Sequence, residues 1–493
     1  MSEIKRVYQN STELMNLAGL PFYMADVVDA CLYGRLNLFL QGDTGSGKTQ
    51  LARDVMDYFP NKSMFVLGRN DMDTRELFQR MNLGRFNQKP LHNLEPLVDI
   101  DTGDINYYYP IFKNGIFTQT KLSSSQTEVV RKSLEKLAGT TEDIRELTSK
   151  VDTRLFVTDE LPNCVPAIRA QLFNLYDGFI ELGGKAYPFG KYFVIEKEGG
   201  SLEFLEAGVS IETLQSLRGS GARIMSDTYS VGIATGNVGQ KFTESNNDLG
   251  RALKDRMHVI LDTDYFKPTA WDTFSILSSN TNPRVDFGAE QNGDLEKRIL
   301  KIHQAVVSVE IPFEKLVLVN YLIHGLDYVN IDGRETTKTK MKDAWPNAIT
   351  NHGIGSDEAL IFPISPRAAK SILRLSQAFD YISKEKGASD EEVKGYYFDS
   401  VMQAFKFVGA YSGILNDLAV RENYANDKYS AIDAIIQASR TQYDSHLEDI
   451  SAGLYMISQG SKSQKVLDSS NGRWGFMRNF LERAVEQNSG VIK

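Results

Sequence analysis

The residues best suited to chemistry lie near the start of the chain, in the run Gly42-Asp43-Thr44-Gly45-Ser46-Gly47-Lys48-Thr49. This run fits the pattern GxxxxGK[ST], and it stands between an apolar stretch at 36–40 and a helical pattern of apolar residues. Glycines let consecutive backbone N–H groups turn toward phosphate oxygens, and the start of a helix adds its positive end. Lys48 can reach the β- and γ-phosphates, and the Thr49 hydroxyl can ligate Mg²⁺. The sequence therefore predicts a binding loop for ATP and Mg²⁺.

Two acids follow a second apolar run, at 154–158. Asp159 at the end of this predicted strand can hold the Mg²⁺ shell, and Glu160 can polarise the attacking water. A protein that only binds nucleotide needs no second carboxylate, so the pair favours hydrolysis. A third apolar run, 231–235, ends in Gly236 and Asn237, whose amide can orient water if the strand is central. These residues form the predicted catalytic set.

An arginine later in the chain is a further candidate. Ser365 and Pro366 are typical of a helix start, as N-cap and first helical residue, and a long amphipathic pattern follows them. Arg367 then lies in the first turn, where its charge opposes the helix dipole. Such an arginine is either solvated or bound to an anion.

The elements that position these residues are five apolar runs near 36–40, 63–67, 154–158, 231–235 and 257–261, separated by helical patterns. Continuous apolar runs of this length are typical of parallel strands buried on both faces. Open sheets of this kind bind ligands at the carboxyl ends of their strands. The fold class predicted is therefore α/β.

Composition narrows the functional classes. The chain has 493 residues, of which 55 are basic and 64 acidic, giving a net charge of -9. Proteins that coat nucleic acid usually carry the opposite sign. No uninterrupted apolar run approaches the length of a membrane span, and the N-terminal sequence lacks the apolar core of a secretory signal. We therefore expect no membrane insertion. The two cysteines lie far apart, so we also expect a reducing, cytoplasmic setting.

The order of these motifs resembles the MoxR-like branch of the AAA+ ATPases, close to the dynein-related AAA group. By this resemblance, 42–49 corresponds to Walker A, 154–160 to Walker B and 233–237 to sensor 1. The run Lys254-Asp255-Arg256-Met257 is similar to the segment that carries the arginine finger, and Ser365-Pro366-Arg367-Ala368 to sensor 2. The resemblance thus implies catalytic roles for Arg256, with Arg251 as the alternative finger, and for Arg367.

The resemblance also implies an organisation. A P-loop ASCE/AAA+ module with a five-stranded parallel sheet in the order 5-1-4-3-2 is expected over 21–262, with inserts near 119–150 and 183–226. A helical or loose leader (1–20) precedes it. A helical lid carrying sensor 2 (263–420) and a C-terminal helical region (421–493) follow it. A third insert is predicted at 335–358.

Two basic and aromatic stretches in these inserts could contact a client. One follows Gly183 and Gly184 and contains Tyr187, Phe189, Tyr192 and Phe193; ordinary strand residues are the favoured interpretation. The other, 336–346, combines lysines with Trp345 and is predicted to be a solvated loop.

Three functions remain open at this point. The favoured one is an oligomeric ATPase, most simply a hexameric ring, that remodels or helps to assemble a protein partner. In the family resembled, that partner often carries a von Willebrand factor A domain. The alternatives are a motor that acts on nucleic acid, as in restriction, replication or packaging, and a nucleotide-gated scaffold.

Overall fold

The computed structural model divides the chain into two compact units. The first unit comprises Met1–Met72, Thr153–Ile180 and Pro188–Lys493, and the second comprises Asp73–Asp152 and Glu181–Tyr187. The structure describes residues 6–69, 77–81, 95–98, 105–113, 116–123, 125–129, 145–182, 185–197, 199–206, 209–237, 251–279, 285, 293–331, 333–341, 345, 357–458 and 470–479.

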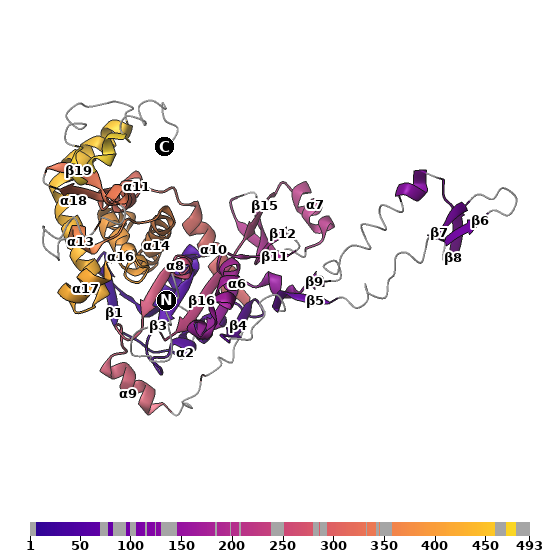
Figure 1. Cartoon of the computed structure of the whole chain (residues 1–493), viewed down its shortest axis with the longest axis horizontal. Coiled ribbons are helices and arrows are strands. Elements are labelled where there is room, and N and C mark those ends of the chain that lie inside the picture. Colours follow the sequence, from indigo (N-terminus) through magenta and orange to yellow (C-terminus); the bar gives the residue numbers. More distant parts are fainter. Residues whose placement is uncertain are drawn as a thin grey trace. The chain divides into compact units, whose positions relative to one another are not determined.

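A five-stranded parallel sheet forms the centre of the first unit (Figure 1). Its strands in spatial order are β17 (Val259–Asp262), β3 (Leu38–Gln41), β16 (Val231–Gly236), β10 (Leu155–Asp159) and β4 (Ser63–Leu67). In order of sequence this is 5-1-4-3-2, so the predicted fold class and strand order are confirmed. The three central strands, β3, β16 and β10, are buried along their whole length, which is why they are apolar on both faces.

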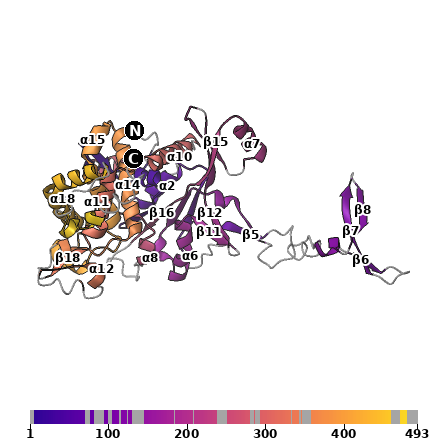
Figure 2. The same cartoon turned by 90° about the horizontal axis from the view of Figure 1, so that it is seen from above.

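Helices cover this sheet (Figure 2). Those within the α/β module are α1 (Met24–Gly34), α2 (Lys48–Met56), α6 (Pro166–Tyr176) and α8 (Arg251–Lys254). Helix α2 packs against β16 and β10, and α6 packs against β16. Because α2 begins at Lys48, directly after the phosphate-binding loop, its amino end faces the carboxyl edge of the sheet.

The N-terminal segment differs from the predicted helical or loose leader. Strands β1 (Glu13–Leu17) and β2 (Leu20–Tyr23) pair antiparallel as a hairpin. Its two-residue turn, Ala18 and Gly19, has positive φ at both positions, the conformation that suits the twist of a tight hairpin. Leu14, Met15, Leu17 and Phe22 are buried in the main core. The hairpin is therefore an integral part of the first unit.

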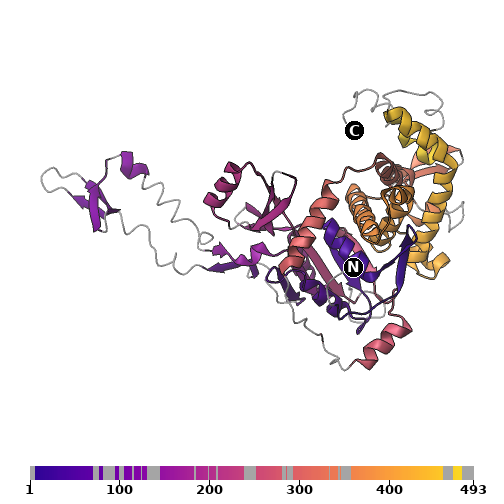
Figure 3. The ribbon, with the colours of Figure 1, turned by 180° about the vertical axis from the view of Figure 1, so that it is seen from behind.

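Most elements after β17 are helices, and they include the long amphipathic helix predicted from its start signals. That helix, α14 (Pro366–Glu385), has Ser365 as its N-cap, whose side chain accepts a hydrogen bond from the Ala368 N–H. It packs against α1, α10, α11 and α16 (Figure 3). The other helices are α9 (Ala270–Ser278), α10 (Gly293–Ser308), α11 (Phe313–Asn320), the π-helix Tyr321–Gly325, α12 (Lys338–Met341), α13 (Asp357–Leu360), α15 (Asp390–Gly395), α16 (Tyr397–Gly409), α17 (Asp417–Tyr424) and α18 (Lys428–Ser458).

The lid region also contains a β hairpin, formed by β18 (Tyr328–Ile331) and β19 (Arg334–Thr337). The prediction of a solvated loop at 336–346 is wrong for two of its residues. Lys338 and Trp345 are buried, and the Lys338 ammonium lies 5.0 Å from the centre of the Trp345 ring. Lys338 also donates to the Ile361 carbonyl oxygen at 2.9 Å. The aliphatic stem and the ring fill a small satellite core instead of facing solvent.

A small antiparallel sheet lies within the predicted insert at 183–226. Its strands in spatial order are β14 (Leu202–Glu206), β13 (Lys191–Glu196) and β15 (Arg223–Thr228), and α7 (Ile211–Gly219) joins β14 to β15. Tyr192 and Phe189 are buried. The Tyr192 hydroxyl donates to Asp227 at 3.1 Å and accepts from Gln304 at 2.8 Å. These two aromatic residues are therefore core residues of the first unit and cannot grip a client.

The second unit contains two small sheets. One pairs β5 (Gln79–Met81) with β9 (Arg145–Leu147), and the other has the order β6 (Glu95–Val98), β7 (Ile105–Lys113) and β8 (Ile116–Lys121). The unit begins at Asp73, earlier than the insert predicted at 119–150. Strands β11 (Phe179–Leu182) and β12 (Lys185–Pro188) also pair. The predicted Gly183–Gly184 turn and most of 130–150 and 346–356 lie outside the described residues.

The sequence predicts no membrane insertion, and the helices of the structure bear on this. Among the residues described, every helix is too short or too polar to cross a bilayer.

Candidate active site

The phosphate-binding loop is held in shape by its own lysine. Lys48 is buried, and its Nζ donates to the carbonyl oxygens of Gly42 at 3.0 Å and Asp43 at 2.7 Å, and to Ser46 Oγ at 3.2 Å. Burial lowers the pKa of Lys48, although the neighbouring carboxylates of Glu160 and Asp264 oppose this shift. The ammonium thus occupies the centre of the loop, where it can exchange carbonyl oxygens for phosphate oxygens.

Two glycines of the loop have no room for a side chain. A Cβ on Gly42, whose φ is +156°, would lie 2.1 Å from Thr263 Oγ1. A Cβ on Gly47, whose φ is +81°, would lie 2.8 Å from the Tyr8 ring. Both positions therefore need glycine for space as well as for backbone conformation. The loop predicted from the sequence is therefore closely packed, with Tyr8 on one side and Thr263 on the other.

A carboxylate and two hydroxyls converge next to the loop. Asp159 Oδ1 accepts from Thr49 Oγ1 at 2.9 Å and from Thr235 Oγ1 at 2.5 Å. Asp159 and Thr235 are buried. Mg²⁺ favours hard oxygen ligands and commonly takes one or two carboxylates, with substrate phosphates and water completing its shell. The Thr49 and Asp159 oxygens are ligands of this kind, and their role in holding Mg²⁺ stays a prediction. Thr235 is a neighbour that the motifs did not identify.

Glu160 has an unusual backbone conformation. Its φ of 56° and ψ of 44° are left-handed, which costs a non-glycine residue on the order of 1 kcal/mol. Its N–H donates to Thr235 Oγ1 at 3.1 Å, and a Cβ on Gly68 would lie 2.4 Å from its carbonyl oxygen. Burial, and then the charge of Asp159, raises the pKa of Glu160, while Lys48 opposes the shift. A carboxylate with a raised pKa beside a metal site is suited to accept a proton from water.

Asn237 lies at the end of the neighbouring strand, directly after β16. Its side chain is half-buried, and its Oδ1 atom is buried without a hydrogen-bond partner among the described residues. Such an atom costs free energy unless another group satisfies it. The role of this amide in orienting water stays a prediction, and its buried Oδ1 is the atom that would accept from the water.

The predicted finger, Arg256, lies at the opposite edge of the sheet. It precedes β17, and its carbonyl oxygen accepts from Asn37 Nδ2, just before β3, at 3.0 Å. Its Nε donates to Asp177 at 3.0 Å, and its guanidinium lies 4.5 Å from the centre of the Phe173 ring. A four-residue strand rises about 13 Å, longer than an arginine side chain. Arg256 is thus separated from the phosphate-binding loop of its own chain.

Arg367 lies beside Arg256 and not beside the loop. Its Nη1 donates to Asp255 Oδ2 at 2.9 Å, and both side chains are nearly half exposed. The same cluster contains His258, which is half-buried and accepts from the Asn37 N–H through Nδ1 at 2.9 Å. Burial, and then the charge of Arg367, lowers the pKa of His258 to about 4. The structure therefore groups both predicted arginines at the amino edge of the sheet. The side chain of the alternative finger, Arg251, lies outside the described atoms.

Several residues of the site are absent from the motifs. Thr263 Oγ1 donates to Ser46 Oγ at 2.8 Å, and the Asp43 N–H donates to Asp264 at 2.8 Å, so the segment after β17 supports the phosphate-binding loop. Gly68 supports Glu160 by its lack of a side chain. The available signal was positional, because Thr235 stands at the end of the predicted strand 231–235, and Thr263 and Asp264 come just after the predicted strand 257–261.

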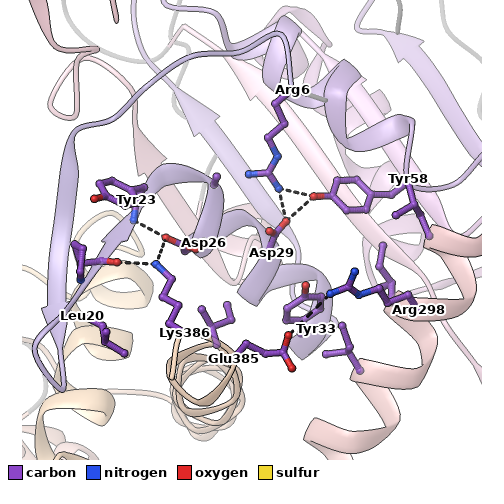
Figure 4. Close-up of a pocket in the computed structure, with 16 residues that line it drawn as sticks. Arg6, Leu20, Tyr23, Asp26, Asp29, Tyr33, Tyr58, Arg298, Glu385 and Lys386 are labelled. Carbon is purple, nitrogen blue, oxygen red and sulfur yellow. Dashed lines mark hydrogen bonds and ion pairs between the residues drawn. The ribbon is translucent and has the colours of Figure 1, made fainter. Parts of the chain in front are cut away.

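A separate cavity of about 560 Å³ lies at the other end of α14 (Figure 4). The β2 segment, α1, α10 and the end of α14 line it. Its cations already have partners within the wall: Lys386 pairs with Asp26 at 2.7 Å, Arg6 with Asp29 at 2.5 Å, and Arg298 with Glu385 at 3.9 Å. The wall thus balances three cations with three carboxylates and has no surplus charge to select an ionic ligand.

Among known proteins, the match that bears on this site is to a family model. No curated protein matches the chain. A solved structure from Cytophaga hutchinsonii, described as a "putative ATPase", shares 13% identity over 84% of this chain and 88% of that chain, with a TM-score of 0.43. The model of the AAA domain of the dynein-related subfamily matches residues 37–177, which contain the phosphate-binding loop, Asp159 and Glu160. This match confirms the predicted ATPase class, and residues 37–177 are similar to AAA domains of the dynein-related subfamily.

Proposed function

We propose that this protein is an oligomeric, Mg²⁺-dependent AAA+ ATPase of the MoxR-like kind that uses hydrolysis to remodel, or to help assemble, a protein partner. One observation carries the hydrolytic part. Thr49 and Thr235 converge on Asp159, and the strained backbone of the next residue displays Glu160 beside them. A protein that only stores nucleotide does not need a second carboxylate on a residue with a strained backbone.

Each residue has a distinct task in this proposal. Lys48 transfers its hydrogen bonds from the loop carbonyls to the β- and γ-phosphates. Thr49 and Asp159 would hold Mg²⁺, which when bound neutralises charge on the phosphates. Glu160 accepts the proton of the attacking water, and Asn237 orients that water through its unsatisfied oxygen. The raised pKa of Glu160 brings it nearer to the pKa of an effective base.

The arginines complete the site from a neighbouring copy. Arg256 and Arg367 lie at the amino edge of the sheet, whereas the phosphates bind at the carboxyl edge. The ion pair between Arg367 and Asp255 is exposed, and such pairs are worth only about 0–1 kcal/mol. The guanidinium is therefore free to exchange its carboxylate for a phosphate. We propose that both arginines act on the nucleotide of the next copy in a ring, for which a hexamer is the expected size.

The client assignment rests on charge and on the family resemblance. The acidic balance of the chain, 64 acidic against 55 basic residues, favours a protein partner over nucleic acid. The resemblance to MoxR-like proteins suggests a partner with a von Willebrand factor A domain. Capture of partners by a variant that binds but cannot hydrolyse ATP would test this part.

Phosphate release tests the hydrolytic part. Glu160→Gln keeps the size of the side chain and loses its ability to accept a proton, so turnover should fall ~10²–10⁴-fold while ATP still binds. The matched control is Glu203→Gln, because Glu203 is half-buried on β14, away from the phosphate-binding loop, and pairs with Lys197 at 2.6 Å. Near-wild-type turnover of Glu160→Gln would contradict the assignment.

A further inference from the structure

We infer that helix α9 is the docking surface for a second copy of this chain, and that its aromatic face seats the copy whose arginines complete the nucleotide site. This inference rests on the proposed function, because it assumes that the arginines of a neighbour enter the site. Helix α9 spans Ala270–Ser278 and stands apart from the helices packed on the sheet (Figures 1 and 3).

The face of α9 is unusually apolar for an exposed helix. Trp271 is 72% exposed, Phe274 59% and Leu277 80%. These residues recur at every third position and so share one side of the helix. The Trp271 and Phe274 rings stack with their centres 5.6 Å apart and their planes at 23°. Polar side chains in place of Trp271 and Phe274 would still allow the helix to form. Helix formation therefore does not explain why these two residues are aromatic.

The size of the face fits a protein interface. Trp271, Phe274 and Leu277 together present on the order of 400 Å² of apolar surface, given that aromatic side chains bury ~150–250 Å² each. A contiguous exposed patch above a few hundred Å² marks an interaction site. A stable interface buries about 800 Å² on each partner, with an apolar centre and a polar rim. The α9 face can therefore supply that centre.

Helix α9 is held rigidly before any partner binds. Thr269 and Asp272 form a capping box at its start, and Asp272 is buried. Asp272 also accepts from the Ser11 N–H at 2.8 Å and from Ser11 Oγ at 2.9 Å. A preorganised surface loses little entropy on binding, which favours association.

The position of α9 favours a second copy as the occupant. Helix α9 follows β17 and therefore lies at the carboxyl edge of the sheet, the edge that carries the phosphate-binding loop. The segment between them contacts that loop through Asp264, which accepts from the Asp43 N–H, and through Thr263, which donates to Ser46. A neighbour that delivers Arg256 and Arg367 to this edge must approach beside α9.

The resulting contact is heterologous. The carboxyl edge of one copy, with α9, meets the amino edge of the next copy, with Arg256 and Arg367. Contacts of this type generate rings when the rotation closes. Burial of the α9 face would thus fix the approach angle of the guanidinium groups, and nucleotide at the loop would add polar contacts to the same interface.

The test is the double variant Trp271→Ser/Phe274→Ser, examined by analytical ultracentrifugation with a non-hydrolysable ATP analogue. Loss of two aromatic anchors should raise the dissociation constant for self-association by at least about 100-fold. The matched control is Leu447→Ser/Tyr455→Ser, which removes two exposed apolar side chains from α18 and should assemble like the wild type. Both variants should keep the wild-type melting temperature, because exposed substitutions change stability little.

Assembly of Trp271→Ser/Phe274→Ser with wild-type affinity would overturn the inference. So would a wild type that stays monomeric with nucleotide while α9 binds phospholipid vesicles or an unrelated protein. Failure of the inference is distinguishable from failure of the proposed function. A wild type that neither binds nor hydrolyses ATP refutes the function, whereas intact ATP binding with α9-independent assembly refutes only the docking surface.

Discussion

The two edges of the central sheet differ in the charge and the purpose of their residues. The carboxyl edge holds the phosphate-binding loop, Asp159, Glu160 and Asn237, which together can bind ATP and activate water. The amino edge holds Arg256 and Arg367, each paired with a carboxylate at or near the surface. In the proposed mechanism, one chain therefore contains both halves of a catalytic site but separates them by the length of a strand. In this mechanism, turnover depends on contact between copies.

The largest expected effect concerns the amino edge. Arg256→Ala should lower turnover ~10³–10⁵-fold, the range for an arginine finger supplied by a neighbouring chain, and should leave ATP binding nearly unchanged. Steady-state phosphate release and equilibrium binding of a fluorescent ATP analogue would measure the two quantities. Arg223→Ala is a suitable control, since Arg223 is exposed and lies in the small antiparallel sheet. Normal turnover of Arg256→Ala would show that the amino edge takes no part in catalysis.

A smaller effect is expected from the support of Glu160 at the carboxyl edge. Gly68→Ala places a Cβ 2.4 Å from the Glu160 carbonyl oxygen, so the backbone that displays the carboxylate must shift. A displacement of about 1 Å can cost ~10²-fold in rate. Gly219→Ala serves as the comparison, because a Cβ there meets nothing within 4 Å. Equal turnover of the two variants would show that the left-handed conformation of Glu160 is incidental.

The smallest expected effect is on the free energy of unfolding, and it concerns Lys338, which lies outside both edges of the sheet. Burial, and then the charge of Arg473, lowers the pKa of Lys338 to about 7. The unfolded chain binds the extra proton between pH 7 and the ordinary lysine pKa, so this residue makes stability rise with pH in that window. Lys338→Met should abolish that contribution, which changes by at most about 1.4 kcal/mol per pH unit. Urea unfolding at pH 7, 8 and 9 would measure it, and turnover should stay unchanged.

A pH-independent difference between Lys338→Met and the wild type would contradict this account of Lys338. It would mean that the ammonium stays protonated in the folded state, held by its contacts with Ile361 and Trp345.

The sequence predicted the framework well because local patterns determine it. The strand expected at 63–67 is β4 without a change of bounds, and Ser365 caps α14 as its type and position indicate. Even the separation of the edges was implicit, since Arg256 precedes a predicted strand and Asn237 follows one.

Contacts between distant segments could not be predicted in the same way. The pairing of Arg367 with Asp255 joins residues 112 positions apart, and nothing in either motif selects the partner. The burial of Lys338 depends on Trp345 and on the segment that ends at Ile361. A lysine-rich stretch taken alone favours solvent, and only the tertiary packing reverses that preference.

We propose that arginines at the amino edge of one copy complete the site at the carboxyl edge of the next. Mixing inactive Lys48→Ala subunits, which lack a working loop, with inactive Arg256→Ala subunits tests it most directly. Random mixing in equal amounts should leave about a quarter of the interfaces with an intact loop and an intact finger, because the contact is heterologous. The account predicts that phosphate release returns to a comparable fraction of the wild-type rate. A mixture that co-assembles but stays as inactive as its components would contradict the claim.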